Sequence, residues 1–173
     1  ERFANEKSCE CCRIGGSLDS QSNPVIAYRA IFPGGIRDQA SQVITAKGSG
    51  PIRRVADDHW KTDACPHHGP SIAVSGFGKF HVAWYTQGSK RAGVFYANSD
   101  NQGLTYSKPM RVGAEGANIA RPYLLAIGRQ VWMVWKEFDG SQSSIYLKES
   151  SDDGSTWGAP KILTSTSGYS DHP

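Results

Sequence analysis

The chain has 173 residues and a mass of 18.8 kDa, which suits one ordinary domain or a piece of a larger one. Its 19 Lys and Arg against 16 Asp and Glu give a formal net charge of +3 without any block of like charges, so we expect neither a nucleic-acid nor a membrane partner. Apolar runs such as 131–135 are too short to cross a bilayer. Because the first residue is Glu1 rather than Met, we expect a processed or excised segment.

Short β-branched and aromatic runs alternate with turn residues along the whole chain. The 19 Gly and 9 Pro are scattered evenly, and no helix-period pattern occurs. This pattern predicts many short antiparallel strands.

An internal repeat of roughly fifty residues organises these strands. The segment 94–106 matches 145–157, and 82–84 matches 133–135 at the same offset. Each unit divides into four expected strands: 71–75, 79–86, 93–99 and 108–113 in the second unit, 122–127, 130–138, 144–150 and 160–165 in the third, and 12–19, 24–31, 36–45 and 51–56 in a fainter first unit. Four-stranded antiparallel units at this period predict an all-β fold, the β-propeller, with each unit as one blade.

Each blade of a propeller covers the faces of its neighbours. We divide the chain into an inter-blade segment 1–11, a degenerate blade 1 at 12–58, blade 2 at 59–113, blade 3 at 114–165 and the start of a further blade at 166–173. Three blades cannot close a ring, because their open flanks would expose apolar area and strand edges. We therefore expect as partner either the remainder of a longer propeller chain or a second copy in a homo-oligomer.

The turn between the third and fourth strands carries a specific motif, S-x-D-x-G-x-T-W. The matching residues are Ser150, Asp152, Gly154, Thr156 and Trp157 in blade 3, and Ser99, Asn101, Gly103, Thr105 and Tyr106 in the degenerate copy of blade 2. The Asp or Asn side chain is expected to cap its own turn by accepting backbone N–H bonds, the Gly to supply a positive φ, and the aromatic ring to fill the gap between sheets. These residues are predicted to be structural rather than catalytic.

This motif resembles the Asp-box of the sialidase superfamily and related propellers. The stretches 9–13, 32–38 and 60–70 look like segments of bacterial sialidase-like BNR-repeat proteins, so that the resemblance covers most of residues 9–165. It implies a six-bladed parent with three blades visible here. Such proteins are usually exported, which implies an extracytoplasmic location, periplasmic or secreted. Most have no established reaction, so the resemblance implies a fold more than a function.

Propellers bind ligands around the central channel, on the face that carries the links between strands two and three and between blades. In this chain that channel face comprises 32–38, 86–92 and 138–142, with the inter-blade links 59–70 and 113–121. The candidate ligand-binding residues there are Arg37, Asp38, Trp60, Asp63, His67, Arg91 and Arg121. Guanidinium groups suit carboxylate or sulfate, and an exposed Trp60 suits stacking on a sugar, so we expect a small anionic or carbohydrate ligand. Alternatively, Arg37 and Asp38 form a local salt bridge, and Arg91 is a solvated hairpin-tip residue.

A sialidase would need three arginines, a Tyr nucleophile activated by a Glu, and an acid Asp. The Arg-Ile-Pro motif of that family is absent, 13–15 is no adequate substitute, and no spacing identifies a Tyr–Glu pair. We assign no catalytic residue and expect no cofactor. A glycoside hydrolase and a purely structural or protein-interaction propeller remain the alternatives to a binding protein.

The four cysteines, Cys9, Cys11, Cys12 and Cys65, form a second group. An even number in an exported chain favours disulfides, and the leading pairing joins Cys65 to Cys11 or Cys12. The alternatives are free thiols or a metal site of Cys65, His67 and His68. His81 lies inside a predicted strand and is expected to be a packed core residue. The tryptophans other than Trp60 are expected to pack between blades.

Overall fold

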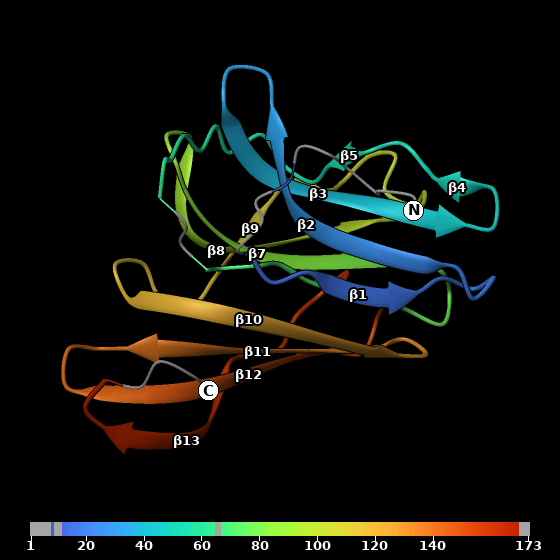
Figure 1. The fold of residues 1–173 in the computed structure, drawn as a ribbon. Coiled ribbons are helices and arrows are strands. Elements are labelled where there is room, and N and C mark those ends of the chain that lie inside the picture. The colour runs from blue at the N-terminus through green and yellow to red at the C-terminus, as the bar shows by residue number, and fades with distance from the viewer. Residues whose placement is uncertain (1–7, 9–11, 65–66, 170–173) are drawn as a thin grey trace.

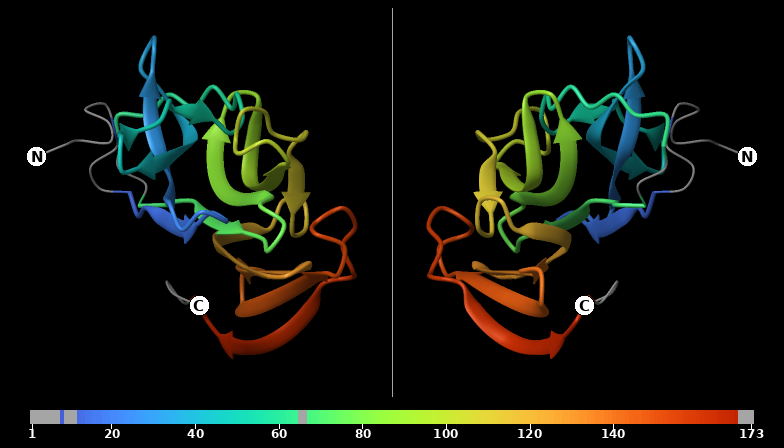
Figure 2. Two further views of the ribbon diagram at one scale, coloured as in Figure 1. Left: turned by 90° about the vertical axis from the view of Figure 1, so that its right-hand side faces the viewer. Right: turned by 90° about the vertical axis from the view of Figure 1, so that its left-hand side faces the viewer.

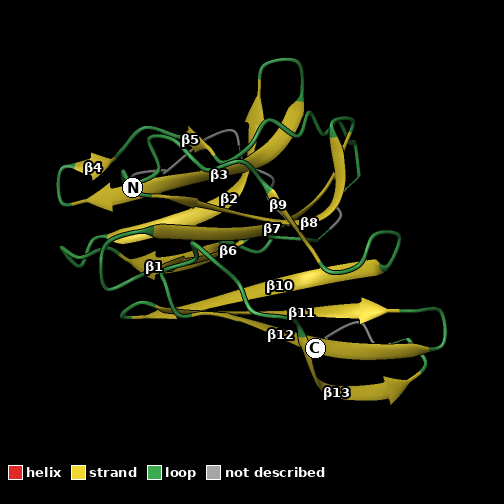
Figure 3. Cartoon of the chain, turned by 180° about the vertical axis from the view of Figure 1, so that it is seen from behind, coloured by secondary structure: helices red, strands yellow, loops and turns green. Residues whose placement is uncertain are grey.

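The computed structural model describes residue 8 and residues 12–64 and 67–169. All regular structure in these residues is β-strand, as the cartoon in Figure 3 shows. No helix in the described ranges has the length and apolar character needed to span a membrane. The strands form three antiparallel sheets, each a meander in chain order.

The sheets correspond to the three predicted blades (Figure 1). Blade 1 contains β1 (Gly15–Leu18), β2 (Pro24–Phe32), β3 (Ile36–Thr45), β4 (Gly48–Ser49) and β5 (Arg53–Arg54). Blade 2 contains β6 (Ser71–Val74), β7 (Phe80–Gly88), β8 (Arg91–Ser99) and β9 (Met110–Val112). Blade 3 contains β10 (Asn118–Ile127), β11 (Gln130–Phe138), β12 (Gln142–Ser150) and β13 (Lys161–Ser167). The predicted all-β fold of antiparallel blades is confirmed.

Blade 1 differs from the prediction at its outer edge. The single fourth strand expected at 51–56 is instead two short strands, β4 and β5, that pair with different parts of β3. Pro51 separates them, and a proline has no N–H to contribute to a β-ladder. The outer edge of this blade is therefore split.

The inner strands β1, β6 and β10 converge where the three sheets fan out from one another (Figure 2). The Ser17 hydroxyl accepts the Val74 N–H at 3.1 Å, and the Ser71 hydroxyl accepts the Leu124 N–H at 3.0 Å. A Cβ on Gly15 would lie only 2.9 Å from the carbonyl oxygen of Pro70. Short side chains and repeated hydroxyl-to-backbone bonds thus set the spacing between blades.

The central strand β7 is buried on both faces. Phe80, Val82 and Trp84 pack against blade 1, while Ala83 belongs to a second cluster that includes Met133 of blade 3. A strand buried on both faces has a nearly continuous run of apolar residues in its sequence, and this explains why β7 is rich in apolar residues. His81 on this strand is completely buried, as expected.

The tryptophans follow the prediction with one exception. Trp84 and Trp135 are buried in the two inter-blade clusters, and the ring of Trp157 meets Tyr96 of blade 2 edge-on at 5.0 Å. Trp132 instead lies opposite Leu125 of β10, outside the two inter-blade clusters.

The motif turns of blades 2 and 3 are closed by the same hydrogen bonds. Asp152 Oδ1 accepts the Thr156 N–H at 2.8 Å, and the Ser150 hydroxyl accepts the Gly154 N–H at 2.9 Å. The corresponding bonds in blade 2, from Thr105 N–H to Asn101 and from Gly103 N–H to Ser99, are both 2.9 Å. Hydrogen bonds from Thr156, followed by that from Ser150, lower the pKa of Asp152 to about 2. The expected capping role of these side chains is therefore observed.

The blade 3 turn also ties blade 3 to blade 2 through a buried polar network. His81 Nδ1 lies 2.7 Å from the Tyr96 hydroxyl, and His81 Nε2 lies 3.1 Å from Asp153 Oδ1. A neutral imidazole satisfies both partners, because one ring nitrogen accepts while the other donates. Asp153, a variable position of the motif, thus reaches into the neighbouring sheet.

Replacing Gly154 tests how closely this turn fits blade 2. Its φ is +75°, and a Cβ there would overlap the Tyr96 hydroxyl. Gly78→Ala is the matched control, because Gly78 has φ +79° with nothing within 4 Å of a Cβ. We expect Gly78→Ala to lower the free energy of unfolding by about 1–2 kcal/mol from backbone strain alone, and Gly154→Ala by clearly more, in urea titrations. Equal losses of unfolding free energy in Gly78→Ala and Gly154→Ala would show that the turn is not closely packed against blade 2.

The buried histidine predicts an acid-sensitive fold. Burial lowers the pKa of His81 below its ordinary value, against the opposing effect of the Asp153 carboxylate. The unfolded chain therefore takes up a proton more readily, so the contribution of His81 to stability is complete above about pH 6.5 and is lost as pH falls through the lowered folded pKa. We expect the free energy of unfolding to fall between about pH 7.5 and about pH 5.5, and to fall less in His81→Gln. The half-exposed His59 gives the control His59→Gln, in which the free energy of unfolding should fall with pH as in the wild type. An unchanged pH dependence in His81→Gln contradicts this account.

Candidate functional site

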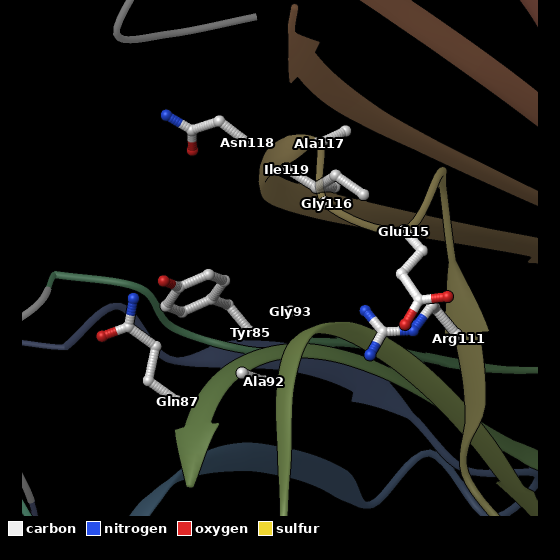
Figure 4. Close-up of a pocket in the computed structure, with 10 residues that line it drawn as sticks. All are labelled: Tyr85, Gln87, Ala92, Gly93, Arg111, Glu115, Gly116, Ala117, Asn118 and Ile119. Atoms are coloured by element: carbon white, nitrogen blue, oxygen red, sulfur yellow. The ribbon is translucent and has the colours of Figure 1, made fainter.

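A cleft of about 510 Å³ opens on the channel face between blades 2 and 3 (Figure 4). Its walls come from the ends of β7 and β8, from β9, and from the link that leads into β10. The lining residues are Tyr85, Gln87, Ala92, Gly93, Arg111, Glu115, Gly116, Ala117, Asn118 and Ile119. This volume lies within the range typical of small-molecule sites.

Blade 2 supplies one wall of the cleft. Tyr85 and Gln87 are two residues apart on β7, so strand alternation places them on the same face. Gly93 on β8 has φ +120°, and a Cβ there would lie 2.7 Å from a guanidinium nitrogen of Arg111. Arg111 lies over the Phe95 ring at 4.9 Å. The glycine thus leaves room for the guanidinium group to reach the cleft.

The link between blades 2 and 3 supplies the other wall. Gly113 and Gly116 have φ of +76° and +80°, which lets five residues turn the chain from β9 into β10. The turn brings Glu115 and Asn118 to the cleft. In Figure 4 the side chains of Arg111 and Glu115 point toward one another, whereas Asn118 lies on the opposite side, with Tyr85 and Gln87.

An aromatic cluster supports Tyr85 from behind. The rings of His68 and Trp60 lie 4.3 Å and 5.8 Å from the Tyr85 ring, measured between centroids. The buried Arg29 guanidinium stacks 4.1 Å from the Trp60 ring and donates to the His68 carbonyl at 2.9 Å. Burial raises the pKa of the Tyr85 hydroxyl, against a hydrogen bond with Gln87 and the Arg29 charge. Tyr85 is therefore a fixed, protonated phenol in the wall of the cleft.

Two of the predicted ligand-binding residues instead organise the link between blades 1 and 2. The Asp38 carboxylate is buried, pairs with Arg54, and accepts the backbone N–H groups of 58–60 at 3.0–3.1 Å. Trp60 is only 4% exposed, so the expectation of an exposed stacking platform is wrong. The ring is needed inside, between Arg29 and Tyr85.

The remaining basic candidates near this link also have structural contacts. Arg91 pairs with the buried Asp58, so the alternative of a solvated hairpin tip is wrong. Asp58 also accepts the Trp84 indole N–H at 2.7 Å, and burial raises its pKa despite these two partners. The Arg37 backbone N–H donates to the Trp60 carbonyl at 2.7 Å. The carboxylate next to Arg37 pairs with Arg54, not with Arg37 as the local-salt-bridge alternative supposed.

The other three candidates lie elsewhere on the channel face. Asp63 and His67 are exposed in the link before β6, and Arg121 sits at an irregularity of β10 with φ +54°. None of the seven candidates is among the described residues that line the cleft. Their ligand-binding role stays a prediction, and the cleft offers a different site.

The cysteine predictions fall largely outside the described residues. Cys9, Cys11 and Cys65 are not described, and Cys12 is buried immediately before β1. The disulfide pairing and the metal alternative of Cys65, His67 and His68 therefore stay predictions. Among the residues that are described, no group of three His, Cys, Asp or Glu side chains is placed to hold a metal ion.

Several cleft residues lie in loops that the sequence assigned to the channel face, but they are not the side chains that the sequence singled out. Gln87 lies in the 86–92 link, and Glu115 and Asn118 lie in the 113–121 link, both assigned to the channel face. Glu115 counts among the acidic residues of that face. Tyr85, Gln87 and Asn118 carry no charge, so no pattern singled them out; their position at strand ends beside the links is the signal that could have found them.

Comparisons with known proteins identify the fold. No family model matches the sequence, and no curated protein matches it. Among solved structures, the Hadza microbial sialidase Hz136 has a TM-score of 0.64 at 17% identity, over 89% of this chain and 38% of that chain. A Dyadobacter fermentans protein of unknown function has a TM-score of 0.60 at 13% identity, over 91% and 51%. The α-L-arabinofuranosidase Arb93A from Fusarium graminearum has a TM-score of 0.59 at 10% identity, over 98% and 53%.

The chain has the β-propeller fold of these structures. It spans 38% to 53% of the length of these three proteins. At such low identities the similarity shows the fold and does not extend to function.

Proposed function

We propose that this protein is an extracytoplasmic propeller that binds a small carbohydrate or anionic ligand in the cleft between blades 2 and 3. The observation that supports it is the convergence of five polar side chains on one open volume of about 510 Å³. These five are Tyr85, Gln87, Arg111, Glu115 and Asn118. A phenol, two amides, a guanidinium and a carboxylate together offer both donors and acceptors, which is what a ligand rich in oxygen atoms requires.

Hydrolysis has less support than binding, although two of the similar structures are glycosidases by name. A tyrosine nucleophile needs a base within hydrogen-bond reach and an easily lost proton. Burial instead raises the pKa of Tyr85, and Glu115 points toward Arg111 in Figure 4. The two groups therefore lack the coupling that a nucleophile–base pair needs.

Amide substitutions in the cleft test the binding site. Gln87→Ala and Asn118→Ala remove hydrogen-bonding groups from β7 and from the start of β10. Each should raise the dissociation constant of a glycan identified on an array by about three- to tenfold in calorimetric titrations. Gln21→Ala is the matched control, because Gln21 is an exposed amide in the β1–β2 turn. If Arg37→Ala and Arg121→Ala abolish binding while the two cleft variants do not, the site lies at the predicted basic residues instead.

We also propose that blade 3 packs against a further blade of a longer propeller chain. Leu125 and Ile127 are 55% and 63% exposed on the face of β10 that points away from blade 2, and Trp132 lies opposite Leu125 on β11. Contiguous apolar surface of this kind is typical of interaction sites. The similar solved structures are about twice as long or longer, which leaves room for more blades.

Matched leucines test this packing in the full-length protein. Leu125→Asp should lower the free energy of unfolding by about 2–5 kcal/mol if a further blade buries the side chain. Leu104, 57% exposed in the blade 2 turn, gives the control Leu104→Asp, which should stay within about 0.5 kcal/mol of wild type. Equally small losses of stability in Leu125→Asp and Leu104→Asp contradict the proposal. If the wild-type protein elutes at twice its monomer mass in size-exclusion chromatography and Leu125→Asp elutes as a monomer, the face instead binds a second copy.

A further inference from the structure

The charged side chains of the cleft balance in number. Of its lining residues only Arg111 and Glu115 carry charged side chains, one of each sign, and the two point toward one another in Figure 4. The opposite side presents the uncharged groups of Tyr85, Gln87 and Asn118. We infer that the cleft selects a neutral sugar over its acidic counterparts, an inference that rests on the proposed carbohydrate binding and narrows it.

Two cations beside the cleft are paired with carboxylates, which reduces the positive potential that they add. A third, Arg29, stacks on the Trp60 ring behind Tyr85. Arg91 pairs with Asp58, and Lys90 pairs with Asp57. Arg54 pairs with both Asp38 and Asp57. Ion pairs at contact distance largely cancel at the range of a bound ligand, and salt screens what remains. Of the basic residues that suggested an anionic ligand from the sequence, Arg91 is thus bound into the link between blades 1 and 2.

Hydrogen-bonding capacity favours hydroxyl groups over carboxylates. A sugar hydroxyl both donates and accepts, and the Gln87 and Asn118 amides and the Tyr85 phenol do the same. A vicinal diol can accept from Arg111 while a neighbouring hydroxyl donates to Glu115. A ligand carboxylate, in contrast, would face Glu115 as a like charge and would compete with it for a single guanidinium. Glu115 is therefore the group that discriminates against acidic ligands.

Paired oligosaccharides test the inference in the full-length protein. We would titrate lactose against 3′-sialyllactose, and xylotriose against its glucuronic-acid-substituted form, at low and high sodium chloride. In each pair that binds, we expect the neutral member to bind more tightly than the acidic member. Its dissociation constant should change by less than about twofold between the two salt concentrations. Equal binding of both members, or tighter binding of the acidic members that salt weakens, overturns the inference while leaving carbohydrate binding in place. No binding by any member, or by any sugar on an array, overturns both.

A charge substitution tests the role of Glu115 directly. Glu115→Gln leaves an amide of similar shape but removes the negative charge. The ratio of the dissociation constants of the acidic and neutral members of each pair should therefore fall by about fivefold. Asp100→Asn changes the net charge equally at the exposed blade 2 turn, remote from the cleft, and should leave the preference unchanged. The same shift in both variants would attribute selectivity to overall charge, and no shift in Glu115→Gln would remove that residue from the selection; either result contradicts the inference.

Discussion

The spacing between inner strands is the constraint on which the rest of the structure depends. A strand at the edge of a sheet has backbone N–H groups without a ladder partner, and at the converging seam they are shielded from water. Ser17 and Ser71 each supply a hydroxyl acceptor to the next blade, at nearly equal distances. Gly15 allows the first two inner strands to approach closely. This spacing lets side chains from facing sheets interdigitate, so that blade 2 is buried on both faces.

The two seams are built alike near the axis but differ on the channel face, because their links differ in length. Between blades 1 and 2 the link is long, and its described residues 55–64 and 67–70 fold back over the seam. Its backbone N–H groups converge on Asp38, and its Trp60 ring fills the space beneath. Between blades 2 and 3 the link 113–117 is short and cannot cover the seam. A cleft remains there, so link length rather than blade sequence decides which seam is open.

The fold could be predicted from the sequence because its determinants are local and repeated. Period-two patterning and the motif turns recur in blades 2 and 3, and each turn is closed by its own side chains. The site could not be predicted in the same way. Asp38 and Trp60 were assigned to a ligand on their residue type, yet both are buried through contacts with distant residues. Such pairing depends on how a link folds over a seam, which no local pattern encodes.

The division between blade core and link explains how a widely used fold can carry different recognition chemistry. Core positions of β7 and β8 must match two neighbours at once, so changes there disturb both seams. The cleft residues stand at strand ends and in a five-residue link, where a substitution alters charge or hydrogen bonding without changing the packing between sheets. The buried ion pair of Arg91 and Asp58 has the opposite character, because loss of either partner leaves a charge inside the seam. Charged residues at a closed seam are thus constrained by stability, whereas those at an open seam, Arg111 and Glu115, are available to set selectivity.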